Sequence, residues 1–280
     1  MRSLLVLAAT AVALITTSLS GPSAGATTEQ AANPSASPRS SLLQPLPSLA
    51  KRCSVLGLRA TTFRFKAADG VLLDGAVLGQ GPVGIVFAHE AVGDLCSWVL
   101  SRLPDGLSQE GFRVLVFDYR GFGLSAKVTG KRATRIDADI LGAIAELRRR
   151  GSEQIVLVGA SLGGSAVLTA AASARPPVAG VVSISGPDSA YLRGGGFFYA
   201  TLDPTAAASR VRSALLFFAS KGDRYVPAKS TGNLYKAATV EDKRLVVVPG
   251  SSHGVSIVSG ASGAKWRSLI LEFIRDHTRS

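Results

Sequence analysis

The chain has 280 residues, of which 46% are hydrophobic and only 18% are charged. This composition is too apolar for an intrinsically disordered protein, and the 30 glycines and 13 prolines follow no three-residue period of the collagen type. An excess of 31 Lys and Arg over 19 Asp and Glu gives a net charge of +12, which raises the question of an anionic partner.

The first 26 residues have the layout of a secretory signal peptide. Arg2 precedes an uncharged apolar run from Leu4 to Ile15, which is shorter than the roughly 20 residues that a membrane-spanning helix needs. Small residues up to Ala26 resemble a cleavage site. We therefore expect residues 1–26 to be removed and the mature protein to be secreted without stable membrane insertion. An uncleaved membrane anchor is the alternative.

A flexible linker is expected to follow, over residues 27–50. This stretch consists largely of Ala, Ser, Pro and Thr, so it breaks helices and offers little to bury. No internal repeat or second linker interrupts residues 51–280, which we predict to form one α/β domain.

Short β-branched runs alternate with longer helical stretches along this domain. Residues 58–66 and 71–78, joined at Asp69-Gly70, are expected to form an antiparallel hairpin. The further expected strands are 84–89, 113–118, 155–159, 178–185, 214–220 and 244–248, and the expected helices are 98–109, 135–150, 162–173 and 266–277. This alternation predicts a mostly parallel, twisted sheet with helices on both faces, whose ligand site lies at the carboxyl ends of the strands.

Two cysteines remain after signal-peptide removal, Cys53 at the start of the domain and Cys96 in a loop after a predicted strand. An even number in a secreted protein favours one disulfide. Two free thiols are the alternative, because sequence does not show whether the two residues lie within bridging distance.

Residues 159–163 read Gly-Ala-Ser-Leu-Gly, directly between a predicted strand and an apolar helix. In this context G-x-S-x-G forms a nucleophile elbow, whose glycines allow the sharp turn that exposes the hydroxyl of Ser161. A serine nucleophile needs a general base and an acid that orients it. His253 follows the last predicted strand and Asp223 follows the strand before it, while Asp188 is the alternative acid.

The chain order Ser161, Asp223, His253, together with Asp-Tyr-Arg-Gly-Phe-Gly-Leu-Ser at 118–125, resembles the α/β-hydrolase superfamily from about residue 59 to the C-terminus. The resemblance implies the α/β-hydrolase fold and a serine hydrolase with Ser161 as nucleophile, His253 as general acid and base, and Asp223 holding the imidazole. No cofactor is expected, and the three scattered histidines offer no metal site.

An oxyanion hole requires two backbone N–H groups, for which the expected donors are Leu162 and Ala91. Glu90 departs from the superfamily pattern, which commonly has glycine after a histidine such as His89. A glutamate here is similar to dienelactone hydrolases. Glu90 is expected either to shape the pocket by pairing with a cation or with His89, or to influence substrate charge preference or the activation of Ser161.

Four other polar residues receive structural roles. Asp118 and Arg120 are expected to brace their loop rather than react. His89, at the end of a buried strand, is interpreted as a hydrogen-bonding residue beside the site, and His277, among charged residues of the last helix, as solvated.

The segment 186–213 is too short for a large helical lid, so an open pocket is expected. Its Phe197 and Phe198 either line an acyl or aryl subsite or pack against the domain. The predicted function is a secreted serine hydrolase that cleaves small carboxylic esters through an acyl-enzyme on Ser161. A peptidase, thioesterase or acyltransferase with the same triad, or a non-catalytic protein that binds the cell wall, remains open.

No motif for reading nucleic acid is present, so no nucleic-acid partner is expected. The basic residues are scattered along the chain, which favours at most weak adsorption to an anionic cell wall. The protein is expected to be a monomer.

Overall fold

The computed structural model describes residues 45–194 and 198–278, so the predicted signal peptide lies outside it. Helix α2, Leu49–Arg52, begins inside the predicted linker, and its Leu49 is buried. The domain therefore starts before residue 51. The composition around this short helix is that of a linker, but the helix packs onto the domain because its apolar side chain is buried there.

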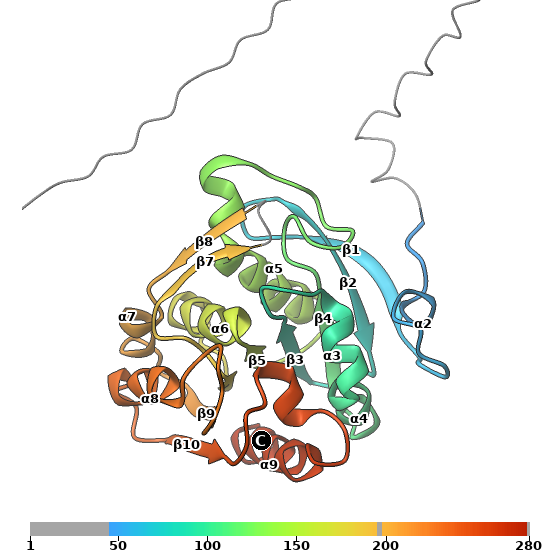
Figure 1. The fold of residues 1–280 in the computed structure, drawn as a ribbon. Helices are drawn as coiled ribbons and strands as arrows, with labels where there is room; N and C mark the ends of the chain where they lie inside the picture. The colour runs from blue at the N-terminus through green and yellow to red at the C-terminus, as the bar shows by residue number, and fades with distance from the viewer. Residues whose placement is uncertain (1–44, 195–197, 279–280) are drawn as a thin grey trace, which may run out of the picture. The chain divides into compact units, whose positions relative to one another are not determined.

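An eight-stranded sheet forms the centre of the domain, with the strand order β1-β2-β4-β3-β5-β6-β9-β10 (Figure 1). Pairs β1–β2 and β2–β4 are antiparallel, and every later pair is parallel. The strands are β1 Thr61–Lys66, β2 Leu72–Leu78, β3 Val83–Ala88, β4 Arg113–Phe117, β5 Gln154–Ala160, β6 Gly180–Ile184, β9 Ala214–Ser220 and β10 Lys243–Val248. The central strands are buried along nearly their whole length, as both faces of a parallel sheet are covered.

Helices cover the two faces of this sheet in two layers, each with its own apolar cluster. One layer contains α5 Ile136–Arg149, α6 Leu162–Ser173, α7 Pro204–Ala208 and α8 Ala228–Ala237. The other contains α3 Leu95–Ser101, α4 Leu103–Gln109, the 3-10 helix η2 Gly254–Val258 and α9 Ala264–His277. None of the helices in the described part of the chain is long and apolar enough to cross a membrane.

Three local features differ from the sequence-based expectation. The helix predicted over 98–109 is two helices, α3 and α4, separated at Arg102, whose φ is 65°. The segment 186–213 contains a hairpin of β7, Ala190–Gly194, and β8, Phe198–Leu202, and α7 is its only helix among the described residues. Helix α8 was not predicted.

Phe197 lies outside the described residues, and Phe198 begins β8.

A disulfide joins Cys53, which follows α2, to Cys96 in α3, with a Cα–Cα distance of 5.2 Å. The predicted pairing is therefore present. The disulfide connects the start of the domain to α3, the helix that comes after β3 and its following loop.

Candidate active site

The turn between β5 and α6 holds Ser161 in a strained conformation, with φ 52° and ψ −120°. Its backbone N–H donates to the carbonyl of Ile184 at 2.8 Å. The flanking glycines are steric requirements. A Cβ on Gly159 would lie 2.2 Å from the carbonyl oxygen of Gly163, and a Cβ on Gly163 would lie 2.2 Å from that of Ala88. The G-x-S-x-G pattern thus lets β5, α6 and the end of β3 approach closely enough to form the elbow.

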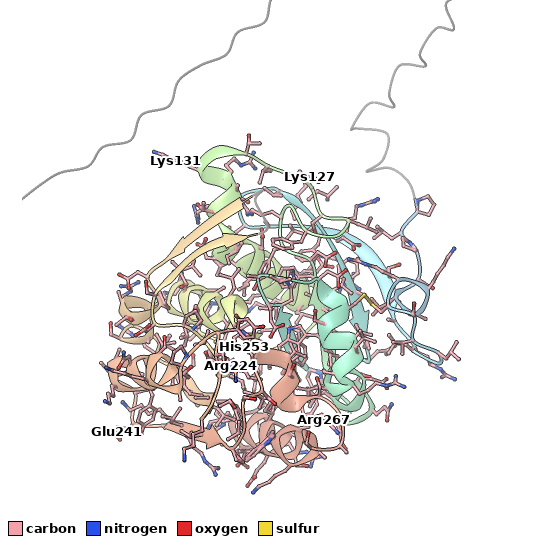
Figure 2. The ribbon with its side chains drawn as sticks, viewed as in Figure 1. Lys127, Lys131, Arg224, Glu241, His253 and Arg267 are labelled. Carbon is pink, nitrogen blue, oxygen red and sulfur yellow. A yellow bond between two sulfur atoms is a disulfide. The ribbon has the colours of Figure 1, made fainter. Side chains whose placement is uncertain are left out.

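The loop after β10 holds His253 (Figure 2), whose Nδ1 lies 2.7 Å from Oδ2 of Asp223. The other carboxylate oxygen, Oδ1, accepts from the backbone N–H groups of Tyr225 at 2.9 Å and Val226 at 3.0 Å. Since a carboxylate only accepts, the proton of the neutral imidazole sits on Nδ1. The lone pair of Nε2 is then free to receive a proton.

A pocket of ≈ 590 Å³ brings the predicted site residues together. Ser161 and His253 both line it, although they are far apart in the chain. Asp223 lies behind His253 with its side chain fully buried, and Leu162, directly after the serine, is also buried. The described lining consists of Glu90, Ala91, Val92, Ser161, Pro187, Ser189, Tyr225, Val226, His253 and Ser256.

Glu90 connects the loop after β3 to the histidine loop. Its Oε1 accepts from the backbone N–H of Val255 at 2.9 Å. Gly254, at φ 51°, leaves room for this contact, because a Cβ there would lie 1.7 Å from Oε1. Burial raises the pKa of Glu90, and the hydrogen bond from Val255 opposes that rise. Neither the predicted cation nor the ring of His89 binds the carboxylate in the described structure.

His89 fixes the backbone that precedes the predicted oxyanion donor. The ring is fully buried, and burial lowers its pKa. Nε2 accepts from the N–H of Tyr119 at 3.2 Å, so Nδ1 is the protonated nitrogen and donates to the carbonyl of Glu90 at 2.7 Å. That carbonyl belongs to the peptide bond whose N–H is that of Ala91. As expected, His89 is a hydrogen-bonding residue beside the site.

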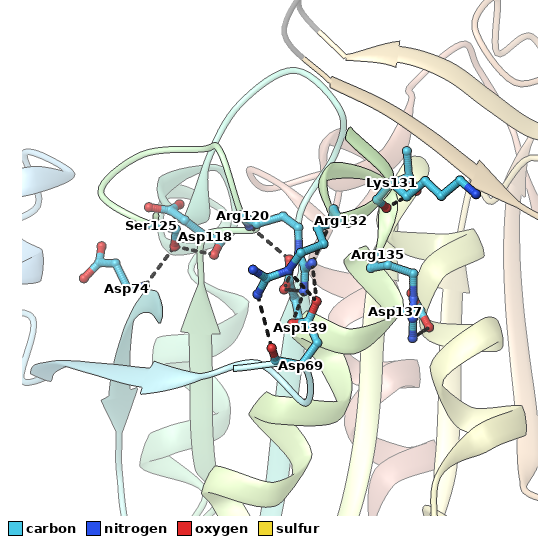
Figure 3. Close-up of polar contacts among 11 residues, drawn as sticks. Asp69, Asp74, Asp118, Arg120, Ser125, Lys131, Arg132, Arg135, Asp137 and Asp139 are labelled. Carbon is cyan, nitrogen blue, oxygen red and sulfur yellow. Dashed lines mark hydrogen bonds and ion pairs between the residues drawn. The ribbon is translucent and has the colours of Figure 1, made fainter. Parts of the chain in front are cut away.

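Arg120 braces the loop after β4 from within the core (Figure 3). Its side chain is fully buried and binds two carboxylates, Asp139 at 2.7 Å and Asp69 at 2.8 Å. The backbone N–H of Arg120 also donates to Asp139 at 2.9 Å. Burial raises the pKa of Asp139 to about 6, although the contacts with the Arg120 guanidinium act to lower it. The predicted bracing role agrees with these contacts.

Asp118, one residue before Tyr119, binds groups from three parts of the chain. Its Oδ1 accepts from the N–H of Leu95 at 2.9 Å, and its carbonyl accepts from the hydroxyl of Ser125 at 2.7 Å (Figure 3). The Arg52 guanidinium binds both Asp118 and the buried Asp74. Burial raises the pKa of Asp74 to about 6. The part played by Arg52 was not predicted, since nothing in its local sequence indicates a partner 66 residues away.

The alternative acid, Asp188, belongs to a different contact. Its carboxylate accepts from the hydroxyl of Ser230 at 2.5 Å and from the amide of Asn233 at 2.7 Å, which attaches the loop after β6 to α8. Burial acts to raise its pKa, but these hydrogen bonds outweigh burial and lower it. The carboxylate that contacts His253 is therefore that of Asp223.

His277 was predicted to be solvated, but the structure shows it in two contacts. Its Nε2 lies 2.8 Å from a carboxylate oxygen of Asp242 and its Nδ1 lies 2.7 Å from the carbonyl of Phe273, so it attaches the end of α9 to the turn before β10. Within the described ranges, no three His, Cys, Asp or Glu side chains are grouped so as to hold a metal ion.

Comparisons with known proteins agree with this architecture. Residues 85–198 match the family model of the alpha/beta hydrolase fold. The uncharacterized protein YfhR of Escherichia coli K12 is 29% identical over 238 residues, which is 77% of this chain and 80% of that protein. Epoxide hydrolase B of Mycobacterium tuberculosis is 34% identical over 108 residues, 39% of this chain and 30% of that protein.

Solved structures show the same fold at low sequence identity. The Pyrococcus furiosus esterase Pf2001 superposes with a TM-score of 0.69 at 17% identity, over 83% of this chain and 95% of the esterase. The Exiguobacterium antarcticum esterase EaEST gives 0.62 at 15% identity, over 77% of this chain and 100% of that enzyme. Together with the family match over residues 85–198, the strand order and the elbow between β5 and α6 show that this chain has the α/β-hydrolase fold.

Proposed function

We propose that this protein is a serine hydrolase that cleaves carboxylic esters through an acyl-enzyme on Ser161. The observation that carries the proposal is that Ser161 and His253 line one pocket while Asp223 holds the Nδ1 side of the imidazole. A strained serine, a base with a free nitrogen and a buried orienting carboxylate are the three parts that nucleophilic acyl transfer requires.

In the first half of the reaction, the Ser161 oxygen attacks the ester carbonyl and Nε2 of His253 takes its proton. The backbone N–H groups of Ala91 and Leu162 are proposed to stabilise the resulting oxyanion. The intermediate then collapses, the bond to the alcohol oxygen breaks, and His253 returns the proton to that oxygen. An ester between the acyl group and Ser161 remains.

In the second half, water replaces the alcohol. His253 removes a proton from the water, whose oxygen attacks the acyl carbonyl, and the same N–H groups face the second oxyanion. Breakdown of this intermediate releases the carboxylic acid, and the proton on His253 goes back to Ser161. Asp223 stays ionised throughout and stabilises the imidazolium.

Carboxylic esters are the proposed substrate class because two structural neighbours, from Pyrococcus furiosus and Exiguobacterium antarcticum, are esterases. An ester also demands less of the enzyme than an amide, since its carbonyl is less stabilised by resonance and an alkoxide leaves more readily than an amide anion. The lining of the pocket, with Ala91, Val92, Pro187 and Val226, suits the apolar part of a small ester.

The test combines a fluorophosphonate probe with a series of para-nitrophenyl esters of increasing acyl length. The wild type should be labelled and should hydrolyse short esters, whereas Ser161→Ala should do neither, with a loss of at least about 10⁴-fold in kcat. Ser256→Ala is the matched control, because Ser256 is an exposed serine in the same pocket. An unlabelled wild type, or equal loss in both variants, would refute the proposal.

We also propose that the enzyme is exported. The disulfide between Cys53 and Cys96 supports this, since such bonds persist in oxidising compartments. Expression of the full chain and of a version without residues 1–26, followed by fractionation, tests it. Activity in the same fraction for both versions would contradict export by that segment.

A further inference from the structure

Among the residues described, the lining of the pocket contains one carboxylate, that of Glu90, and no Lys or Arg, and His253 is its one nitrogen base. Arg224 precedes the lining residue Tyr225, but its side chain is exposed and does not line the pocket. A charged group on a bound substrate would therefore meet a field dominated by Glu90, with His253 as the other titratable neighbour.

The carboxylate of Glu90 is placed to act on a ligand. Oε1 is bound by the N–H of Val255 at 2.9 Å, while Oε2 has no hydrogen-bond partner among the residues the structure describes. Glu90 is only partly exposed, so its charge is less screened than that of a surface carboxylate. One oxygen thus fixes the side chain, and the other remains available.

An aromatic ring lies at the same pocket. The Tyr225 ring centroid is 5.1 Å from that of His253, and Tyr225 is 81% exposed. An aromatic face attracts ammonium groups, and a carboxylate nearby adds to that attraction. Glu90 and Tyr225 line the same pocket, and a carboxylate and an aromatic face each attract an organic cation.

We propose that this pocket selects esters that carry an ammonium group and disfavours esters that carry a second carboxylate, with Glu90 as the specificity-determining residue. The inference rests on the proposed ester hydrolysis and names its substrate class. It assigns Glu90 no part in bond making or breaking.

Turnover tests the preference through isosteric esters in two series. In one series the acyl chain ends in a trimethylammonium, a tert-butyl or a carboxylate group, and in the other the alcohol carries those groups. In at least one series, the wild type should prefer the cationic ester, and Glu90→Gln should lower the ratio of kcat/KM for cationic over neutral ester by about 10-fold, because the electrostatic attraction to the carboxylate is lost. Gln can still accept from Val255, so the loop contact survives.

Glu241→Gln is the matched control, because Glu241 is exposed and lies away from His253 (Figure 2). It should leave the ratio unchanged. If Glu90→Gln lowers the rates for cationic and neutral esters equally in both series, Glu90 is a structural residue and the inference is wrong. If no ester is hydrolysed by the wild type, the proposed function fails instead.

Equilibrium binding then decides the inference without turnover. Calorimetric titration with choline and with its uncharged carbon isostere compares the two ligands in the wild type and in Glu90→Gln. The wild type should bind choline more tightly than the isostere, by about 10-fold, and Glu90→Gln should show a smaller difference between the two ligands because only the Tyr225 ring then attracts the ammonium group. Equal binding of the two ligands by the wild type would overturn the inference.

Discussion

Replacing Asp223 by Asn should remove the base function of His253 while leaving the fold intact. Oδ1 of Asp223 accepts from the N–H groups of Tyr225 and Val226. In the variant, only the amide oxygen can take that position, so the NH₂ group faces His253. Nδ1 must then accept a hydrogen bond, which moves the imidazole proton to Nε2. A ring protonated at Nε2 cannot receive the proton of Ser161.

The expected loss is about 10⁴-fold in kcat, equivalent to about 5.5 kcal/mol of transition-state stabilisation. Steady-state hydrolysis of a short para-nitrophenyl ester measures it, and urea denaturation checks the fold. Asp188→Asn is the matched control, because it makes the same change in a partly buried contact with Ser230 and Asn233. Its kcat should fall by less than about 3-fold.

Two results would refute this reasoning. If Asp223→Asn keeps more than a tenth of wild-type kcat, the carboxylate does not set the tautomer of His253. If Asp188→Asn loses as much activity as Asp223→Asn, the acid has been assigned to the wrong residue. Loss of the folded state in the Asp223 variant would show in the denaturation curve and would be distinguished from loss of chemistry.

Three further predictions concern stability. Gly163→Ala would place a Cβ 2.2 Å from the Ala88 carbonyl oxygen, so its unfolding free energy in urea should fall by at least about 3 kcal/mol, and an unchanged value would contradict the close approach. Reducing the disulfide between Cys53 and Cys96, 43 residues apart, should lower the unfolding free energy by about 4 kcal/mol, whereas an unchanged Tm would disprove its contribution. The raised pKa of Asp74 means that the folded state binds its proton more tightly than the unfolded state does. The resulting contribution to the free energy of unfolding is fully present below a pH of about 3.8 and is lost as the pH rises through about 6. Asp74→Asn should therefore show a smaller fall in unfolding free energy across that window, and an equal fall would show that Asp74 does not titrate there.

Elements with a strong local signal were predictable from sequence. Helix α6 and strand β9 occupy the predicted residues 162–173 and 214–220, since each is an apolar run bounded by turn residues. The break between α3 and α4 was missed. Pro104 indicated it, because proline is favoured in the first turn of a helix and disfavoured in its interior. Helix α8 was missed although its residues are amphipathic; Gly232 in its interior lowers the helix propensity of this short segment.

The placement of the three proposed catalytic side chains was predictable, because chain order and sheet topology fix their positions. Ser161, Asp223 and His253 each follow a parallel strand, and such strand ends meet at one edge of the sheet. The partner of Glu90 was not predictable, because its contact with Val255 joins residues 165 apart through backbone geometry that no local pattern encodes.

The end of β4 holds the proposed oxyanion loop at both of its ends. The N–H of Tyr119 donates to His89, where the loop begins, and the carboxylate of Asp118 accepts from Leu95, where α3 begins. Ala91 lies between these two points, so its N–H can keep one direction while the nearby pocket remains open to substrate. Asp118 and His89 thus belong to the framework that would preorganise the N–H of Ala91 as the proposed donor. Changes to this framework should lower kcat more than they raise KM, because an oxyanion donor acts mainly on the transition state.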